Sequence, residues 1–336
     1  MAVNIQQLKT SDIQQIEKLF KGEKSPDEIK WLFENPDDTV SLNGFKAIEG
    51  EKIVGVIGYV ISYYKYQDKE FKGVIPMSWQ VDPEYKGFAG VLLFKKVLSL
   101  GDFGMAIGGS YEAQDVYPVF KLKFQYFYNE YYKLIHPIRF IRSRQKSLIN
   151  NLGYTLLAAR SFLQPVRKNT IEGLEIQSQA ASNPFQNTDN TWDTMHKVLS
   201  AGYMKWLLNC PLVDSYSYTI SYKGKYLGIA IIYISILKGV RRGRIVHIPF
   251  LGDNIKVWTN VIAYLNAYLK GKGCCYISAV ANTPIMKKAL DRMSFSNIRR
   301  QRKPFFIKDE NHILDNIPLT NWHLQYSEGD KAYRNM

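Results

Sequence analysis

The sequence predicts two tandem α+β domains, each a mixed, mostly antiparallel, twisted sheet flanked by helices in αβα layers. Three observations predict this fold class: a length of 336 residues, an internal repeat, and one order of helix and strand patterns in both copies. A chain of this length suits two domains of roughly 150–170 residues better than one. We place the domains at 1–165 and 189–336. The linker falls at 166–188, where Ser, Asn, Gln and Pro gather without an apolar period.

The repeat rests on two matching stretches. Lys30-Trp-Leu-Phe-Glu-Asn-Pro36 recurs as Lys205-Trp-Leu-Leu-Asn-Cys-Pro211, which sets Trp31 and Trp206 175 residues apart. Soon after, residues 45–55 are echoed by residues 218–228, and both stretches continue as apolar, β-branched runs. Two matches in nearly one register favour a duplication.

Each copy shows the same order of predicted elements. Helices are expected at 11–21 and 191–201, followed by short helices that end in the tryptophan motifs. Strand pairs follow at 45–49 with 52–63 and at 217–222 with 225–237. The remaining elements are strands 74–81 and 244–251, helices 90–100 and 256–270, strands 103–107 and 274–280, helices 112–121 and 284–293, and a final strand in each copy.

Composition favours a soluble cytoplasmic protein. The N-terminus carries no apolar signal segment, and the longest apolar stretch, 227–237, is shorter than a membrane-spanning helix. Three cysteines, two of them adjacent, give neither a disulfide framework nor a zinc spacing, and we expect no metal site. The net charge is +14, concentrated in the basic clusters 238–244 and 299–303. These clusters are either solvated surface or contacts for phosphates, so a nucleic-acid partner stays open.

The most specific motif follows the strand that ends at Val81. Its sequence is Trp79-Gln-Val-Asp-Pro-Glu-Tyr-Lys-Gly-Phe-Ala-Gly-Val-Leu-Leu-Phe94. This segment resembles the acyl-CoA motif of the GNAT (Gcn5-related N-acetyltransferase) family, and the element order of each copy is similar to that fold. Lys86 stands where Arg or Gln is usual, and the glycine spacing is compressed. The resemblance covers most of the chain and implies a fold better than a substrate.

The turn suits a phosphate for physical reasons. Small residues in a tight turn let backbone N–H groups converge on an anion, and the following helix offers its positive dipole end. The predicted cofactor-binding residues for acetyl-CoA, or another acyl-CoA, are Val81, Lys86, Gly87, Phe88, Ala89, Gly90 and Val91.

The second copy departs from the motif. Its loop has one glycine and places Asp253 where phosphates would lie, which predicts a copy that has lost cofactor binding. Two further stretches, Ile107-Gly-Gly-Ser110 and Trp322-His-Leu-Gln-Tyr-Ser-Glu-Gly-Asp330, resemble a tandem GNAT group associated with bacterial polysaccharide and cell-envelope gene sets.

The resemblance also implies catalytic roles. In the family, a backbone N–H at the end of the cofactor strand serves the oxyanion, which here indicates Val81. In the family a Tyr commonly acts as the general acid, and Val119 stands at its position here. Val119 cannot donate a proton. Tyr117 and Ser110 are the substitutes, and Glu112 is a candidate base. Each of the three also has a plain structural interpretation, such as Ser110 as a helix cap. A hydrogen-bonded structural role is favoured for His247.

These features predict an acyltransferase, most simply an N-acetyltransferase, acting on the amine or hydroxyl of a small or sugar-linked acceptor. One alternative is the Fem-type transferases, which use aminoacyl-tRNA and would employ the basic C-terminal half. Another is a non-catalytic GNAT-like binding protein. The acceptor and the oligomeric state are not set by the sequence.

Overall fold

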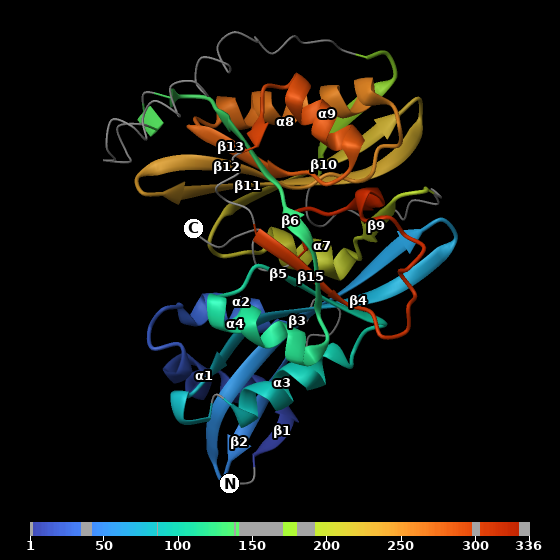
Figure 1. The fold of residues 1–336 in the computed structure, drawn as a ribbon. Coiled ribbons are helices and arrows are strands. Elements are labelled where there is room, and N and C mark those ends of the chain that lie inside the picture. Colours follow the sequence, from blue (N-terminus) through green and yellow to red (C-terminus); the bar gives the residue numbers. More distant parts are fainter. Residues whose placement is uncertain are drawn as a thin grey trace, which may run out of the picture. The chain divides into compact units, whose positions relative to one another are not determined.

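The computed structural model describes residues 3–34, 42–85, 87–137, 139–140, 171–179, 192–297 and 303–328. The chain forms two compact units, drawn as ribbons in Figure 1. Unit 1 comprises Met1–Tyr126, Lys197–Leu212 and Pro304–Asn316, and unit 2 comprises Phe127–His196, Val213–Lys303 and Ile317–Met336. Each unit therefore draws segments from both sequence copies.

Unit 1 is built on a sheet with the strand order β1-β2-β3-β4-β5-β15-β6. Its strands are β1 Asn4–Gln7, β2 Gly44–Glu49, β3 Lys52–Tyr66, β4 Lys69–Val81, β5 Phe103–Ile107, β15 Lys303–Lys308 and β6 Lys123–Tyr128. The pairs from β1 to β4 are antiparallel, β4 and β5 are parallel, and β5 and β15 are antiparallel. The predicted mixed, mostly antiparallel sheet is confirmed.

The strands β4 and β5 diverge early. They pair only at Gly73 with Phe103 and at Val74 with Gly104. Beyond that point β4 continues along β3 with a bulge, because Gly58 faces Met77 while Val56 faces Gln80. Ser78 lies in the bulge with a φ of 49°, in the left-handed region. The second half of β4 is therefore bent and is not paired by β5 along its other edge.

Helices cover both faces of this sheet. They are η1 Thr10–Asp12, α1 Ile13–Leu19, α2 Pro26–Phe33, η2 Pro83–Tyr85, α3 Phe88–Leu98, α4 Tyr111–Val116, η3 Tyr117–Phe120 and α7 Ala201–Leu208. A Cβ on Gly55 would meet Leu93 of α3 at 3.1 Å, and a Cβ on Gly58 would meet Phe33 of α2 at 3.0 Å. Because residues three apart on a strand face opposite sides, α3 and α2 lie on opposite faces of the sheet.

Unit 2 has a second sheet with the order β14-β7-β13-β12-β11-β10-β8. Its strands are β14 Ser296–Asn297, β7 Glu130–Leu134, β13 Tyr276–Val280, β12 Val240–His247, β11 Lys225–Leu237, β10 Asp214–Tyr222 and β8 Leu174–Gln179. The unit also contains α8 Ile255–Gly271, α9 Pro284–Arg292, η5 Leu319–Asn321 and β16 Trp322–His323, which pairs with the start of β9 Met195–Val198.

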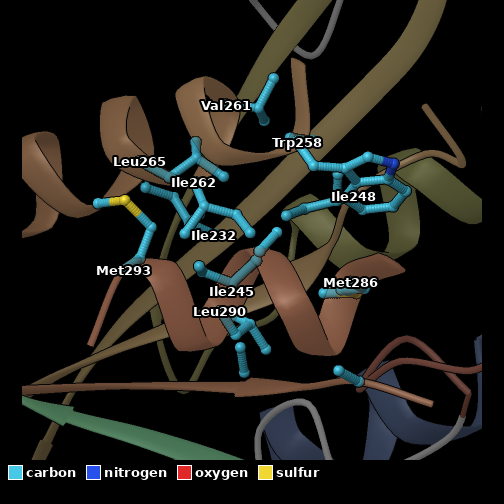
Figure 2. Packing of buried hydrophobic residues seen from close by; sticks show 14 of the residues in the cluster. Ile232, Ile245, Ile248, Trp258, Val261, Ile262, Leu265, Met286, Leu290 and Met293 are labelled. Carbon is cyan, nitrogen blue, oxygen red and sulfur yellow. The ribbon is translucent and has the colours of Figure 1, made fainter. Parts of the chain in front are cut away.

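The core of unit 2 lies between this sheet and its two long helices. Figure 2 shows Trp258, Ile262 and Leu265 of α8 and Leu290 of α9 gathered around Ile232 of β11. All five side chains are fully buried. Burying a large apolar side chain contributes roughly 1.5–3 kcal/mol, so this layer fixes α8 and α9 on the sheet. No helix in the described ranges has both the length and the hydropathy to cross a membrane.

The last strands of the two copies are exchanged. β15, from the second copy, lies between β5 and β6 of the first sheet, and β7, from the first copy, lies between β13 and β14 of the second sheet. The predicted boundaries 1–165 and 189–336 describe the two sequence copies, whereas each compact unit completes its sheet with a strand from the other copy.

Most predicted elements are present, and three expectations were wrong. The predicted helix 191–201 contains the strand β9, because this segment pairs with β16 instead of following a helical period. The linker 166–188 contains β8, which extends the second sheet beside β10. The predicted helix 112–121 is split into α4 and η3, and Pro118 lies in the first turn of η3.

Candidate functional site

The end of β4 is the first part of the candidate site. Val81 pairs directly with Gly55 of β3, and the following amide, Asp82 N, donates to Val54 O at 2.8 Å. Hydrogen-bonded and non-hydrogen-bonded pairs alternate along an antiparallel ladder. Because Asp82 and Val54 are a hydrogen-bonded pair, the neighbouring pair of Val81 and Gly55 is not hydrogen-bonded. The N–H of Val81 therefore points away from β3, towards the edge that β5 leaves unpaired.

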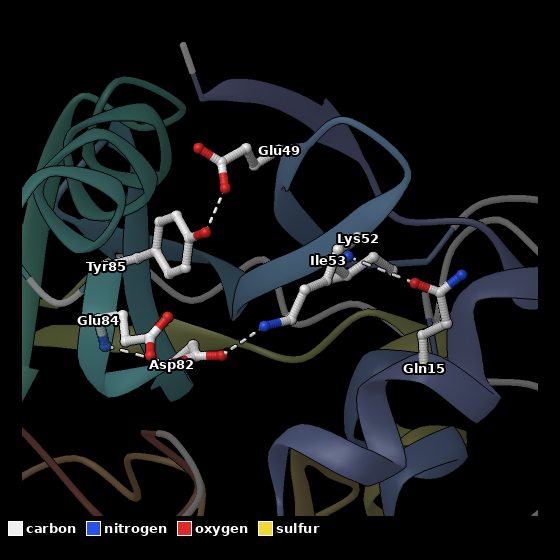
Figure 3. Close-up of polar contacts among 7 residues, drawn as sticks. All are labelled: Gln15, Glu49, Lys52, Ile53, Asp82, Glu84 and Tyr85. Atoms are coloured by element: carbon white, nitrogen blue, oxygen red, sulfur yellow. Dashed lines mark hydrogen bonds and ion pairs between the residues drawn. The ribbon is translucent and has the colours of Figure 1, made fainter. Parts of the chain in front are cut away.

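Polar contacts fix the turn after β4, as Figure 3 shows. The Asp82 carboxylate accepts a hydrogen bond from Glu84 N at 3.3 Å and pairs with Lys52 Nζ at 2.9 Å. Tyr85 donates its hydroxyl to Glu49. The hydrogen bond from Lys52 lowers the pKa of Asp82, and the bond to Glu49 raises the pKa of Tyr85. The carboxylate of Asp82 is thus neutralised by Lys52 just before α3 begins.

The start of α3 is open and uncapped. Gly87 is its N-cap, and no side chain caps the helix. A Cβ on Gly87 would meet no atom within 4 Å, and Phe88 is 60% exposed. Uncapped N–H groups at the positive end of a helix attract anions. Ala89 is buried and Val91 is half-buried, so both offer backbone groups rather than side chains. Lys86 lies outside the described residues.

Two buried polar atoms in the second half of β4 lack a hydrogen-bond partner among the described residues. They are Ser78 Oγ, in the β4 bulge, and Trp79 Nε1. A Cβ on Gly90 would lie 3.0 Å from Trp79 Cζ2 and 3.6 Å from its Nε1, so Gly90 lets the first turn of α3 pack on the indole. A buried unpaired donor costs roughly 1–3 kcal/mol, which a ligand acceptor would recover. Sequence reasoning missed both atoms, although their residues lie three and two positions before Val81.

The predicted proton-transfer residues have structural contacts. Ser110 caps α4, because its hydroxyl accepts from Ala113 N at 3.3 Å. Tyr117 is buried, and its ring centroid lies 4.9 Å from that of Phe306 on the exchanged strand β15. Glu112 is exposed in the first turn of α4. Ser110 and Glu112 are exposed, and Tyr117 is buried.

The corresponding opening in unit 2 is filled by the chain itself. β12 and β13 pair only from Arg242 to Arg244, as β4 and β5 pair only near their starts. Beyond that point, Ser327 N donates to Val246 O at 3.1 Å, and Gln325 Nε2 donates to Ile248 O at 2.7 Å. Gln325 Oε1 also accepts from Ile248 N. The C-terminal segment therefore takes up the backbone groups at the end of β12.

The helix start in unit 2 is closed as well. Asn254 caps α8 by accepting from Lys256 N at 3.0 Å. The indole of Trp258 donates to Gly252 O at 2.7 Å, and a Cβ on Gly252 would lie 2.8 Å from the ring of Trp192. The loop before α8 is thus capped and covered, in contrast to the loop before α3.

The other predicted polar residues of unit 2 are interior. His247 is buried and its Nδ1 lies 3.1 Å from Ser327 Oγ, as a structural histidine would. In the cluster 238–244, Arg242 and Arg244 are buried: Arg242 donates to Ser235 Oγ, and Arg244 lies 4.4 Å from the ring centroid of Tyr326. These two arginines are therefore neither solvated surface nor an exposed phosphate contact. Residues 299–302 lie outside the described part. Within that part, no group of His, Cys, Asp and Glu side chains is arranged to hold a metal ion.

Comparison with known proteins shows which solved structures share this architecture. No protein-family model and no curated protein matches the sequence. A GCN5-related N-acetyltransferase from Anabaena variabilis is similar with a TM-score of 0.61 and 10% identity, covering 92% of this chain and 73% of its own. A GCN5-related N-acetyltransferase from Kribbella flavida has a TM-score of 0.52 and 8% identity, covering 91% of this chain and 70% of its own. N-myristoyltransferase from Saccharomyces cerevisiae with bound myristoyl-CoA has a TM-score of 0.55 and 11% identity, covering 92% of this chain and 79% of its own. At such identities the likeness concerns the fold: the chain has the GNAT fold, in two copies.

Proposed function

We propose that this protein is an acyl-CoA-dependent acyltransferase whose donor binds in unit 1, at the end of β4 and the start of α3. One observation carries the proposal: an unpaired strand edge, an open helix N-terminus and the orphaned indole N–H of Trp79 occur side by side. A fold alone does not define an activity. This local combination suits a ligand that has both a phosphate and a chain able to lie along a strand.

The residues present fit acyl-CoA. The backbone N–H groups of Phe88, Ala89 and Gly90 would hold the pyrophosphate, and Lys86 would add a positive charge. When bound, acyl-CoA supplies an acyl group activated as a thioester. The N–H of Val81 points to the unpaired edge, where it would donate to the carbonyl oxygen on which negative charge develops.

The acceptor in this proposal is an amine or hydroxyl of a small or sugar-linked molecule, and acetyl-CoA is the simplest donor. An attacking amine must lose a proton, and Glu112 is the exposed carboxylate of the predicted set. The Ser110 hydroxyl can still donate its proton while it caps α4, whereas the buried Tyr117 would have to become accessible to the acceptor.

We also infer one donor site for each chain. The end of β12 and the start of α8 are occupied by Gln325, Ser327 and Trp192, so the second copy offers neither free backbone groups nor an open helix start. Its role in the proposal is structural, since it supplies α7 and β15 to unit 1.

A second candidate function is donor binding without turnover. The burial of Tyr117 favours it, because burial withdraws this proton donor of the predicted set from a bound acceptor. The two functions share one site and differ only in whether a product forms.

An activity assay separates them. Release of the CoA thiol from acetyl-CoA is followed with amines, amino sugars and alcohols as acceptors, for the wild type and for Gly87→Glu. Gly271→Glu is the matched control, because Gly271 also has no atom within 4 Å of a built Cβ and lies at the end of α8. Acceptor-dependent release in the wild type and the control, lost in Gly87→Glu, supports the acyltransferase. Binding of acetyl-CoA without release with any acceptor supports the second candidate.

A further inference from the structure

Unit 1 contains a pocket that the donor site does not use. Its volume is about 210 Å³, below the roughly 300–1,000 Å³ of pockets for drug-sized ligands. Its walls come from the end of α2, the start of β2, the strands β3 and β4, and helix α7. The lining residues that carry the argument are Glu34, Tyr59, Lys72, Met77 and Trp206.

The pocket and the proposed donor site share one strand. Met77 lines the pocket and directly precedes Ser78, the residue with positive φ in the β4 bulge. Val81 is four residues further along β4, which is at most about 14 Å of extended chain. A molecule in this pocket would therefore lie beside the strand along which the acyl group is proposed to bind.

Two opposite charges line the pocket without neutralising each other. The Glu34 carboxylate and the Lys72 ammonium have no hydrogen bond or ion pair with any described residue. Glu34 is exposed at the end of α2, and Lys72 is half-buried on β4. The backbone of Lys72 is fixed, because its N–H donates to Asp102 Oδ2 at 2.8 Å. Charges of both signs that no described residue pairs, in one small pocket, are complementary to a ligand with an ammonium and an anionic group.

Neutral groups complete the walls. Burial raises the pKa of Tyr59, so its hydroxyl stays protonated at neutral pH. The ring of Trp206 is held by Trp31, since the two indoles stack with centroids 4.7 Å apart and each donates to the other residue's carbonyl at 2.8 Å. Apart from Glu34 and Lys72, the lining residues are uncharged.

We propose that this pocket binds the acceptor, and that the acceptor is a small zwitterion of the α-amino acid class. Glu34 holds its amine and Lys72 holds its carboxylate. This inference rests on the proposed acyltransferase function and specifies its substrate. The ammonium first loses one proton to solvent, and the resulting amine nitrogen forms an amide bond with the acyl carbon. The thioester C–S bond breaks, and the second proton from the nitrogen goes to the leaving CoA thiolate.

The test uses the full chain, acetyl-CoA, and matched acceptors: leucine, its amide, which lacks the carboxylate, and isoamylamine, which lacks it as well. Glu34→Gln and Lys72→Met are compared with Glu70→Gln and Lys69→Met, which make the same changes at exposed positions at the start of β4. We expect KM for leucine to rise about tenfold or more in both pocket variants, as for the loss of a hydrogen bond to a charged group. Lys72→Met should leave KM for leucinamide and isoamylamine nearly unchanged, whereas Glu34→Gln raises it for all three.

Two titrations keep this inference separate from the proposed function. Acetyl-CoA is titrated into every variant, and leucine is titrated into the wild type and Lys72→Met. Unchanged acetyl-CoA affinity in the pocket variants shows that the fold and the donor site are intact. Acetyl-CoA binding without saturable leucine binding overturns the pocket inference and leaves the donor site standing. Leucine binding that Lys72→Met does not weaken also overturns it. Absence of acetyl-CoA binding in the wild type refutes the proposed function instead.

Discussion

The stacked tryptophans of the repeated motif give an asymmetric prediction. Trp31 and Trp206 are 4% and 3% exposed, and the indole N–H of each donates to the backbone carbonyl of the other. The Trp31 carbonyl also accepts from Glu34 N at 3.2 Å. The Trp206 carbonyl has no other donor among the described residues. Phe at either position keeps an aromatic ring and removes one N–H, so the two substitutions differ mainly in the carbonyl left behind.

The magnitudes follow from this difference. Trp206→Phe removes one hydrogen bond and leaves the Trp31 carbonyl paired with Glu34, a loss of about 1 kcal/mol. Trp31→Phe removes one bond and orphans a buried carbonyl, a loss of about 2–3 kcal/mol. Hydrogen exchange of the α7 amides measures the opening free energy of that helix directly. Trp192→Phe, in unit 2, is the control and should leave α7 protection unchanged. Equal losses, or a larger loss for Trp206→Phe, would refute the reasoning.

Two further predictions concern unit 2 and the strand exchange. Burial lowers the pKa of His323 from 6.5 to about 4, so the folded state binds fewer protons than the unfolded state in this range. Stability is therefore full above pH 6.5 and falls as pH drops towards 4, by about 3 kcal/mol from this group. Denaturant unfolding at pH 7 and pH 4.5 should show a smaller difference for His323→Gln than for the wild type, and equal differences would contradict the assignment. A fragment of residues 1–165 lacks β15 and α7, so β5 keeps an unpaired edge. We expect this fragment to aggregate or stay unfolded by circular dichroism, and a cooperatively folded monomer would be inconsistent with the exchange.

The sequence predicted the fold well where a pattern is local. The strand 103–107 is found at those residues, and the helix 256–270 is α8 with one residue more at each end. Both are apolar and periodic, and both lie in a core where burial reinforces local preference. The match between the two copies also extended each assignment from one copy to the other.

Non-local pairing explains what the sequence could not predict. β7 and β15 are short strands whose partners lie in the other copy, and nothing in their own residues indicates which sheet they join. β8 has the polar composition of a linker and forms a strand because β10 offers an edge. β9 lies in the segment predicted as a helix and forms a strand because it pairs with β16.

The candidate site shows the same limit. The position of Val81 and the glycine turn followed from the motif, because their geometry is set by neighbours in the chain. The unpaired Trp79 Nε1 and the hydrogen bonds from Gln325 and Ser327 to the end of β12 depend on contacts between residues far apart in the sequence. The sequence singled out residues 322–330 as a family-like ending, and the hydrogen bonds to β12 give part of this segment a physical role.

The most direct test of the account is calorimetric titration of acetyl-CoA into the full chain, into Gly87→Glu and into Gly271→Glu. The account predicts one site per chain in the wild type and in Gly271→Glu. In Gly87→Glu, the carboxylate at the open start of α3 repels a pyrophosphate and should weaken binding about tenfold or more. A wild type that does not bind acetyl-CoA, or an affinity that Gly87→Glu leaves unchanged, would contradict the donor site in unit 1. Two equal sites per chain would contradict the closure of the second copy.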